Sequence, residues 1–366
     1  MSYPFPSLWI NGRNVYIQDI IAARASAEND FEQSTFDFIK NWLGDKDVFE
    51  IQTSGSTGTP KKLIVTRDQM IASARMTEQA LSLKAGDTAL VCLNTQYIAG
   101  RMMLVRCFTT GMRMVVTDPS ANPLAYRPSD VSIDFTALVP YQLYTILSSE
   151  QAGVLNTIRC AIIGGAPLNT ETRETLQAYT CQFYATYGMT ETISHIALQA
   201  LNGAIASPAF KALPGVTLGV DARGCLTIET PHLEEKITTN DLVDLHDAMH
   251  FIWLGRWDNV INSGGVKIIP EHLESKVSNV LYRCGILRPF FIGSIPDYKL
   301  GEKIVLVLED DGPLDEKNKS KIFEEFKQSF SAYESPKEIF TITKFIYTDT
   351  HKINRRKTIE MLTKQV

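Results

Sequence analysis

The sequence predicts an α/β fold: a large layered α/β domain with a mostly parallel sheet and a β-rich portion, followed by a small α+β domain. Short apolar runs alternate with longer segments of helical pattern up to about residue 213, and this alternation is typical of parallel sheets covered by helices. Beyond that point the runs become hairpin-like, which indicates antiparallel strands. Of the 366 residues, 44% are hydrophobic and 21% are charged, so the chain can fill a large core and is long enough for about two domains.

Four apolar runs are predicted to form buried strands of the large domain. They comprise residues 88–93, 113–117, 135–139 and 159–163. Segments of helical pattern accompany them, at residues 68–83, 98–109 and 141–147. In the β-rich portion, residues 216–220 and 225–228 flank a turn that ends in Gly224, which predicts a hairpin. In the tail after Phe251, Pro270 is placed to begin a helix, and residues 290–293 and 303–308 are predicted as strands.

Charge and cysteine content exclude several classes of protein. The formal net charge is -5 and no basic stripe is present, so we expect no nucleic-acid partner. The first 20 residues lack a basic start followed by an apolar core, and no run of about 18 apolar residues exists, so we expect neither a secretion signal nor a membrane span. The six cysteines are scattered without metal-ligand spacing, as in proteins of a reducing cytoplasm. The sequence therefore predicts a cytoplasmic protein, an enzyme rather than a scaffold.

A loop rich in glycine and hydroxyl residues is the most informative local feature. Its candidate phosphate-binding residues are Thr53, Ser54, Gly55, Ser56, Thr57, Gly58 and Lys61. Glycines let backbone N–H groups approach phosphate oxygens, and a lysine adds positive charge. The Walker A pattern does not fit, because Pro60 stands where its second glycine should be. A solvated linker is the structural alternative, but Ile51 and residues 63–65 bracket the loop with apolar side chains.

The loop resembles the phosphate-binding signature of the adenylate-forming superfamily, which includes acyl-CoA synthetases, luciferases and peptide-synthetase adenylation domains. Further motifs follow in that family's order. The segment from Tyr187 through Gly188 to Thr190 and Glu191 matches the family's Y-G-x-T-E motif. The resemblance implies that Tyr187 stacks on adenine, Thr190 contacts the α-phosphate and Glu191 coordinates Mg²⁺. An isolated Thr-Glu pair would more commonly be a helix start.

Two further segments resemble the family's nucleotide-binding motifs. Gly164, Gly165 and Ala166 follow a predicted strand and would lie beside the adenine ring. Asp241, preceded by Asn240 where the family has glycine, and Arg256 would bind the ribose. A tight turn or an ordinary hairpin is the structural alternative for each segment alone, although a hairpin does not explain the sequence Gly-Arg-x-Asp.

The C-terminal motifs imply a small, mobile domain that carries a catalytic lysine. The resemblance makes Asp258 the hinge, which divides the chain into domains 1–257 and 258–366. Gly264 and Gly265 would face the coenzyme A channel, and Lys352 would be the catalytic lysine, with His351 in place of the usual glycine.

The resemblance implies an acid–CoA ligase that uses ATP, Mg²⁺ and coenzyme A. A carboxylate attacks the α-phosphorus of ATP, pyrophosphate leaves, and a thiol then attacks the acyl-adenylate. Lys61, Glu191 and Lys352 would stabilise the developing charge, and no protein base is needed because the carboxylate is already ionised.

The acid is predicted to be a small aromatic carboxylic acid. Residues 93–101 and 193–195, together with the short stretch before Thr53, look most like o-succinylbenzoate–CoA ligases of menaquinone synthesis. Arg101 and His195 are candidates for the second carboxylate, and Tyr97 for the pocket wall. A surface arginine and a structural histidine are the alternatives for the first two. Activation of another acid, loading of a carrier protein, and a non-catalytic adenylate-binding module are the alternative functions. Lys352 argues against the last, because binding alone would not require it.

Overall fold

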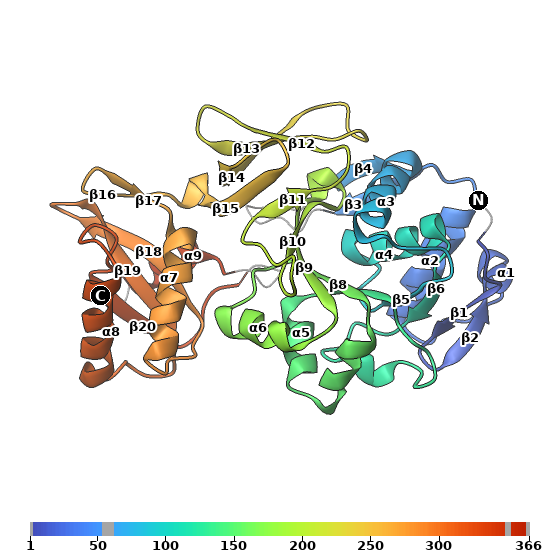
Figure 1. The fold of residues 1–366 in the computed structure, drawn as a ribbon, viewed down its shortest axis with the longest axis horizontal. Coiled ribbons are helices and arrows are strands. Elements are labelled where there is room, and N and C mark those ends of the chain that lie inside the picture. Colours follow the sequence, from blue (N-terminus) through green and yellow to red (C-terminus); the bar gives the residue numbers. More distant parts are fainter. Residues whose placement is uncertain (1–2, 53–61, 348–352, 364–366) are drawn as a thin grey trace. The chain divides into compact units, whose positions relative to one another are not determined.

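The computed structural model describes residues 3–52, 62–347 and 353–363 of the chain (Figure 1). It divides into two compact units. The large unit comprises Met1–Gly219, Ile228–Ile237 and His246–Phe251, and the small unit comprises Val220–Thr227, Thr238–Leu245 and Ile252–Val366. The division of the chain into domains at Trp257 stays a prediction.

The largest sheet has 13 strands in the order β12-β13-β14-β15-β11-β10-β9-β8-β7-β5-β6-β1-β2. Its strands are β1 (Ser7–Ile10), β2 (Arg13–Tyr16), β5 (Thr88–Val91), β6 (Arg113–Val116), β7 (Phe135–Leu138), β8 (Cys160–Ile163), β9 (Gln182–Gly188), β10 (His195–Ala200), β11 (Phe210–Ala212), β12 (Thr217–Val220), β13 (Cys225–Glu229), β14 (Ile237–Leu245) and β15 (His250–Arg256). From β1 through β6, β5, β7 and β8 to β9, neighbouring strands run parallel. The predicted mostly parallel sheet and the hairpin strands around Gly224 are therefore confirmed.

Helices cover the parallel strands, as the alternating pattern predicts. They are α1 (Ile17–Ile21), α2 (Asp30–Leu43), α3 (Arg67–Leu81), α4 (Ile98–Thr110), α5 (Pro140–Leu147) and α6 (Thr170–Thr175). α3 packs against α4, and α4 contacts β5 and β6. The short 3₁₀ segments are Pro123–Tyr126, Glu150–Thr157, Leu176–Ala178, Thr190–Thr192 and Trp257–Asn259. All four residues of each of β5, β7 and β8 are buried, which explains why these strands read as continuous apolar runs in the sequence.

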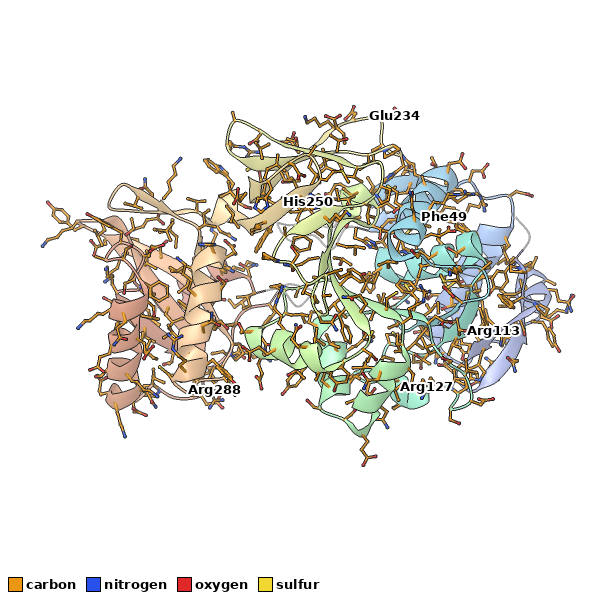
Figure 2. All side chains as sticks on the ribbon, in the orientation of Figure 1. Phe49, Arg113, Arg127, Glu234, His250 and Arg288 are labelled. Atoms are coloured by element: carbon orange, nitrogen blue, oxygen red, sulfur yellow. The ribbon has the colours of Figure 1, made fainter. Side chains whose placement is uncertain are left out.

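A separate antiparallel hairpin brackets the glycine-rich segment. It pairs β3 (Val48–Gln52) with β4 (Lys62–Thr66), and Gln52 lies opposite Lys62. Phe49 of β3, labelled in Figure 2, packs on Phe38 and Trp42 of α2, with ring centroids 5.6 and 5.5 Å away. Arg67 lies 5.0 Å over the Trp42 ring. This aromatic cluster anchors the hairpin to α2.

The small unit contains a five-stranded sheet with helices on both faces (Figure 1). Its elements are β16 (Ile261–Ser263), β17 (Val266–Ile268), α7 (Pro270–Arg283), β18 (Phe290–Asp297), β19 (Gly301–Glu309), α8 (Glu316–Ser329), β20 (Glu338–Ile342) and α9 (Arg355–Thr363). Side chains of α7 and α8 form one core with β18 and β19. Side chains of α9 form a second core with the alternate residues of these strands, on the other face of the sheet. The predicted α+β character of this tail is confirmed. None of the helices in the described part of the chain has the length and apolar character needed to cross a bilayer.

Candidate functional site

Two predicted adenine-binding segments meet at one edge of the large sheet. Residues 164–166 follow β8, and Tyr187 and Gly188 end the neighbouring parallel strand β9. Ligands of parallel sheets bind at this carboxyl edge of the strands. A Cβ on Gly164 would lie 2.7 Å from the Thr186 hydroxyl oxygen, and Gly165 has φ +97°. Gly164 is therefore required by a close contact and Gly165 by its backbone conformation, independently of any ligand at this edge.

Tyr187 is held as an aromatic wall at this edge. Its ring packs edge-on against Phe210 and Phe251, with centroids 5.9 and 5.1 Å away. The two phenylalanine rings are stacked on each other, with centroids 5.4 Å apart. Edge contacts of this kind fix the plane of the ring, so Tyr187 is suited to stack on a flat base.

Thr190 and Glu191 lie on a single 3₁₀ turn directly after β9. Glu191 is exposed, whereas Thr192, the last residue of the turn, is completely buried. Among the described residues, no group of three or more His, Cys, Asp and Glu side chains is arranged to hold a metal ion. A cation at Glu191 can take further ligands from phosphate oxygens and water, which is how Mg²⁺ is commonly bound.

The predicted ribose-binding residues come together within the small unit. Trp253 Nε1 donates to Asp241 Oδ1 at 3.2 Å, and the Arg256 guanidinium lies 3.8 Å from the same oxygen. Arg256 also forms a two-pronged ion pair with Asp258, with both N–O distances 2.9 Å. Burial raises the pKa of Asp258, but hydrogen bonds and charge from Arg256 outweigh it and hold that pKa below its usual value. Asp258, the predicted hinge residue, is thus ion-paired with Arg256, which is predicted to bind the ribose.

Gly264 and Gly265 form the exposed turn between β16 and β17. Their φ angles are +59° and +83°, and two successive residues in this region favour glycine strongly. The structure therefore explains both glycines by the hairpin turn, and their contact with coenzyme A stays a prediction.

Eight predicted site residues lie outside the described part of the chain. They are Thr53, Ser54, Gly55, Ser56, Thr57, Gly58, Lys61 and Lys352. The described chain resumes next to them at β4 and at Ile353, which pairs with Tyr347 in an isolated bridge. Their phosphate-binding and catalytic roles stay predictions.

Arg101 and Tyr97 lie at the start of α4. Arg101 Nε donates to the Thr95 carbonyl at 3.0 Å and its Nη1 donates to the Glu50 carbonyl at 2.7 Å. These bonds to backbone oxygens favour the structural alternative for Arg101. The Tyr97 side chain is 58% exposed, and its place in a pocket wall stays a prediction.

His195 is buried in a network of polar side chains. Its Nε2 lies 3.2 Å from the Thr77 hydroxyl, and its Nδ1 lies 3.4 Å from Arg106 Nη2. Burial, and then the charge of Arg106, lower the pKa of His195 well below its usual value. The ring is therefore neutral near pH 7 and offers no charge to a carboxylate, which favours the structural alternative for His195.

Arg106, which the sequence analysis missed, is the buried cation of this network. It is 2% exposed. Its hydrogen-bond partners are neutral: the Thr77 hydroxyl at 3.3 Å, the Ser194 hydroxyl at 2.5 Å, the Met103 sulfur at 3.8 Å and the His195 ring. No carboxylate of the described residues forms an ion pair with it. An arginine within the apolar run 102–108 is the sequence signal that could have identified it.

Comparison with known proteins identifies a protein family that matches most of the large unit. The family model described as AMP-binding enzyme matches residues 15–222. A solved structure described as an acyl-CoA synthetase (AMP-forming)/AMP-acid ligase II-like protein, from Dyadobacter fermentans DSM 18053, is 42% identical. The match has a TM-score of 0.63 and covers 93% of this chain and 97% of that one.

Curated relatives are more distant in sequence. The 2-succinylbenzoate–CoA ligase of Bacillus mycoides (strain KBAB4) is 28% identical over 253 residues, 61% of this chain and 53% of that protein. That of Salmonella typhimurium is 25% identical over 342 residues, 89% of this chain and 71% of that protein. The matches thus span 53% and 71% of the lengths of these two relatives. The O-succinylbenzoate coenzyme A synthetase of Bacillus subtilis, solved with ATP and magnesium ion, has a TM-score of 0.68 at 21% identity. It covers 85% of this chain and 69% of that one, and shows a shared fold.

Proposed function

Because the chain belongs to the AMP-binding enzyme family, we propose that it is an acid–CoA ligase that acts through an acyl-adenylate. The observation that carries this proposal is the grouping of the 164–166 loop, Tyr187 and the Thr190–Glu191 turn at the carboxyl edge of β8 and β9. This edge combines an aromatic wall for a base with an exposed carboxylate for a cation, as a magnesium-bound nucleotide requires.

The chemistry joins two anions and then replaces phosphate by sulfur. A carboxylate oxygen of the acid forms a bond to the α-phosphorus, and the bond to pyrophosphate breaks. The sulfur of coenzyme A then bonds to the acyl carbon, AMP leaves, and the thiol proton passes to solvent. Both steps place negative charge on phosphate oxygens, so the main demand on the protein is charge stabilisation and orientation.

Residues of this chain meet these demands in distinct ways. Tyr187 stacks on the base, and Asp241 with Arg256 binds the ribose hydroxyls. Thr190 would donate to the α-phosphate, and Glu191 would hold Mg²⁺, whose positive charge would offset that of the phosphates. Lys61 and Lys352 are proposed to contact the phosphates as pyrophosphate leaves. Rotation about Asp258 would then bring Gly264 and Gly265 to the thiol, as in other enzymes whose steps alternate by domain movement.

We propose o-succinylbenzoate as the acid, with its second carboxylate taken by Arg106. The names of the curated relatives support this substrate, and the surroundings of Arg106 support the contact. A buried cation is costly when its partners are neutral, as all partners of Arg106 among the described residues are, and an added carboxylate would supply an opposite charge. Arg106 therefore replaces Arg101 and His195 as the candidate for this contact.

The test is pyrophosphate release across a panel of carboxylic acids, with and without coenzyme A. We expect o-succinylbenzoate to give the highest kcat/KM, with a thioester formed only when coenzyme A is present. Release with a different acid would refute the substrate while leaving the chemistry standing. Thioester formation on a carrier protein but not on free coenzyme A would identify a carrier-loading enzyme. Nucleotide binding without release for any acid would identify a non-catalytic module.

A further inference from the structure

The turn that follows β9 contains a backbone conformation that its sequence does not favour. Ile193 has φ +68° and ψ -46°, and the Ser194 N–H donates to the Thr192 carbonyl at 2.7 Å. This is a γ-turn with positive φ at its centre, which is rare and strained. A β-branched side chain makes that φ still less favourable, so neighbouring contacts must hold the turn in place.

Thr192 supplies the contacts that close this turn. Its side chain is fully buried. The hydroxyl accepts from the Met189 N–H at 2.9 Å, and its oxygen lies 2.9 Å from the Met189 carbonyl and 2.8 Å from the Ser194 carbonyl. One hydroxyl therefore bridges the start and the end of the segment that carries Thr190 and Glu191.

Two further residues, His232 and Gly188, lie close to the turn. The Thr192 carbonyl lies 3.4 Å from His232 Nε2, and since a carbonyl only accepts, this nitrogen must carry the hydrogen. A Cβ on Gly188 would lie 2.6 Å from the Ser194 carbonyl oxygen and 2.5 Å from His195 Cα. The absence of a side chain at Gly188 thus lets the end of the turn approach β9.

We infer that Thr192 is a positioning residue, whose hydroxyl holds the strained turn so that Thr190 and Glu191 meet the α-phosphate and Mg²⁺. This inference rests on the proposed function, since it assigns those two contacts. Without the hydroxyl, the Met189 N–H and one carbonyl lose a buried partner, and the γ-turn can relax to negative φ. Glu191, the exposed residue of the same turn, would then move away from its cation.

The test compares three variants by their requirement for Mg²⁺. Thr192→Val keeps the shape and deletes the hydroxyl, whereas Thr192→Ser keeps the hydroxyl. Thr136→Val is the matched control, because Thr136 is also fully buried and its hydroxyl donates to a backbone carbonyl, that of Leu90, at 3.1 Å. Acid-dependent exchange of pyrophosphate into ATP is measured against Mg²⁺ concentration, with the melting temperature of each variant.

We expect Thr192→Val to lower the exchange rate about 10- to 100-fold, the usual effect of removing a group that orients a metal ligand, and to raise the Mg²⁺ concentration for half-maximal rate. Thr192→Ser should show the wild-type exchange rate and the wild-type Mg²⁺ requirement. Thr136→Val should keep the wild-type Mg²⁺ requirement even if its melting temperature falls. If Thr192→Val does not fold, Thr192→Ala against Thr192→Ser gives the same comparison of hydroxyl against none.

A wild-type rate and Mg²⁺ requirement in the hydroxyl-free variant would overturn the inference, and so would equal losses in the serine and hydroxyl-free variants. Failure of the proposed function is distinguishable, because the wild-type chain itself would then show no exchange with any acid, and the inference would fall with it.

Discussion

The charge of Arg106 provides a quantitative prediction about acid selectivity. Burial lowers the pKa of this guanidinium from 12.5 to about 10, an effect that Cys107 only partly opposes. Each pKa unit corresponds to about 1.4 kcal/mol, so keeping this charge without an anion costs the free protein on the order of 3 kcal/mol. A carboxylate of the substrate that pairs with Arg106 can recover at most about this amount.

We therefore expect Arg106→Met to lower kcat/KM for o-succinylbenzoate by about 100-fold, since 1.4 kcal/mol is about tenfold. The kcat/KM for benzoylpropionate, the analogue without the ring carboxylate, should fall little, because this acid has no second charge to pair with Arg106. For Arg106→Lys, kcat/KM with o-succinylbenzoate should lie between those of wild type and Arg106→Met, since lysine keeps the charge but loses the planar fork of donors. The melting temperature of Arg106→Met should not fall steeply, because an unpaired buried charge is removed.

The assay is pyrophosphate release with each acid at saturating ATP and coenzyme A, and Arg101→Met is the matched control on the same helix. The control should keep the wild-type ratio of kcat/KM for o-succinylbenzoate to kcat/KM for benzoylpropionate, because Arg101 donates to the backbone carbonyls of Thr95 and Glu50. Equal losses for both acids in Arg106→Met would show that Arg106 only supports the fold. A changed ratio in Arg101→Met would return the second carboxylate to Arg101.

Three further predictions concern the lysine, the turn and the buried histidine. Lys352→Ala should abolish acid-dependent exchange of pyrophosphate into ATP, and intact exchange with failed thioester formation would contradict its role. Gly188→Ala should destabilise the large unit by about 1–3 kcal/mol, the usual cost of overpacking, as measured by urea unfolding; an unchanged midpoint would contradict the close approach of Ser194 and His195. Because His195 stays neutral when folded, its unfolded form binds a proton that the folded form does not, so its contribution to stability should fall as pH drops below about 6.5. The melting temperature of His195→Gln should therefore depend less on pH in that range, and parallel curves for variant and wild type would argue against a neutral His195.

Patterns within a short stretch of sequence were enough to predict the strands and several motifs. The runs 88–93, 113–117, 135–139 and 159–163 form β5 to β8, because strands buried on both faces must be apolar throughout. The glycines at 164–165 and 264–265 lie where tight turns or close approaches require them. In these cases the physical cause lies within a few residues of its effect.

Contacts between distant segments were not predictable in this way. His195 reaches Thr77 across 118 positions, and nothing near either residue signals that they meet. The γ-turn at Ile193 opposes the local preference of a β-branched residue, so only its tertiary contacts explain it. Arg106 is a charge in an apolar run, but two of its neutral partners, Thr77 and Ser194, come from α3 and from the turn after β9, far away in the sequence.

Direct detection of the acyl-adenylate tests the central claim most sharply. The chain is incubated with ATP, Mg²⁺ and o-succinylbenzoate, first without coenzyme A and then with it, and the products are identified by mass spectrometry. We expect an acyl-adenylate with release of pyrophosphate in the first stage, and its conversion to a thioester with an equal amount of AMP in the second. A thioester formed with ADP and phosphate, or no adenylate with any acid of the panel, would contradict the account.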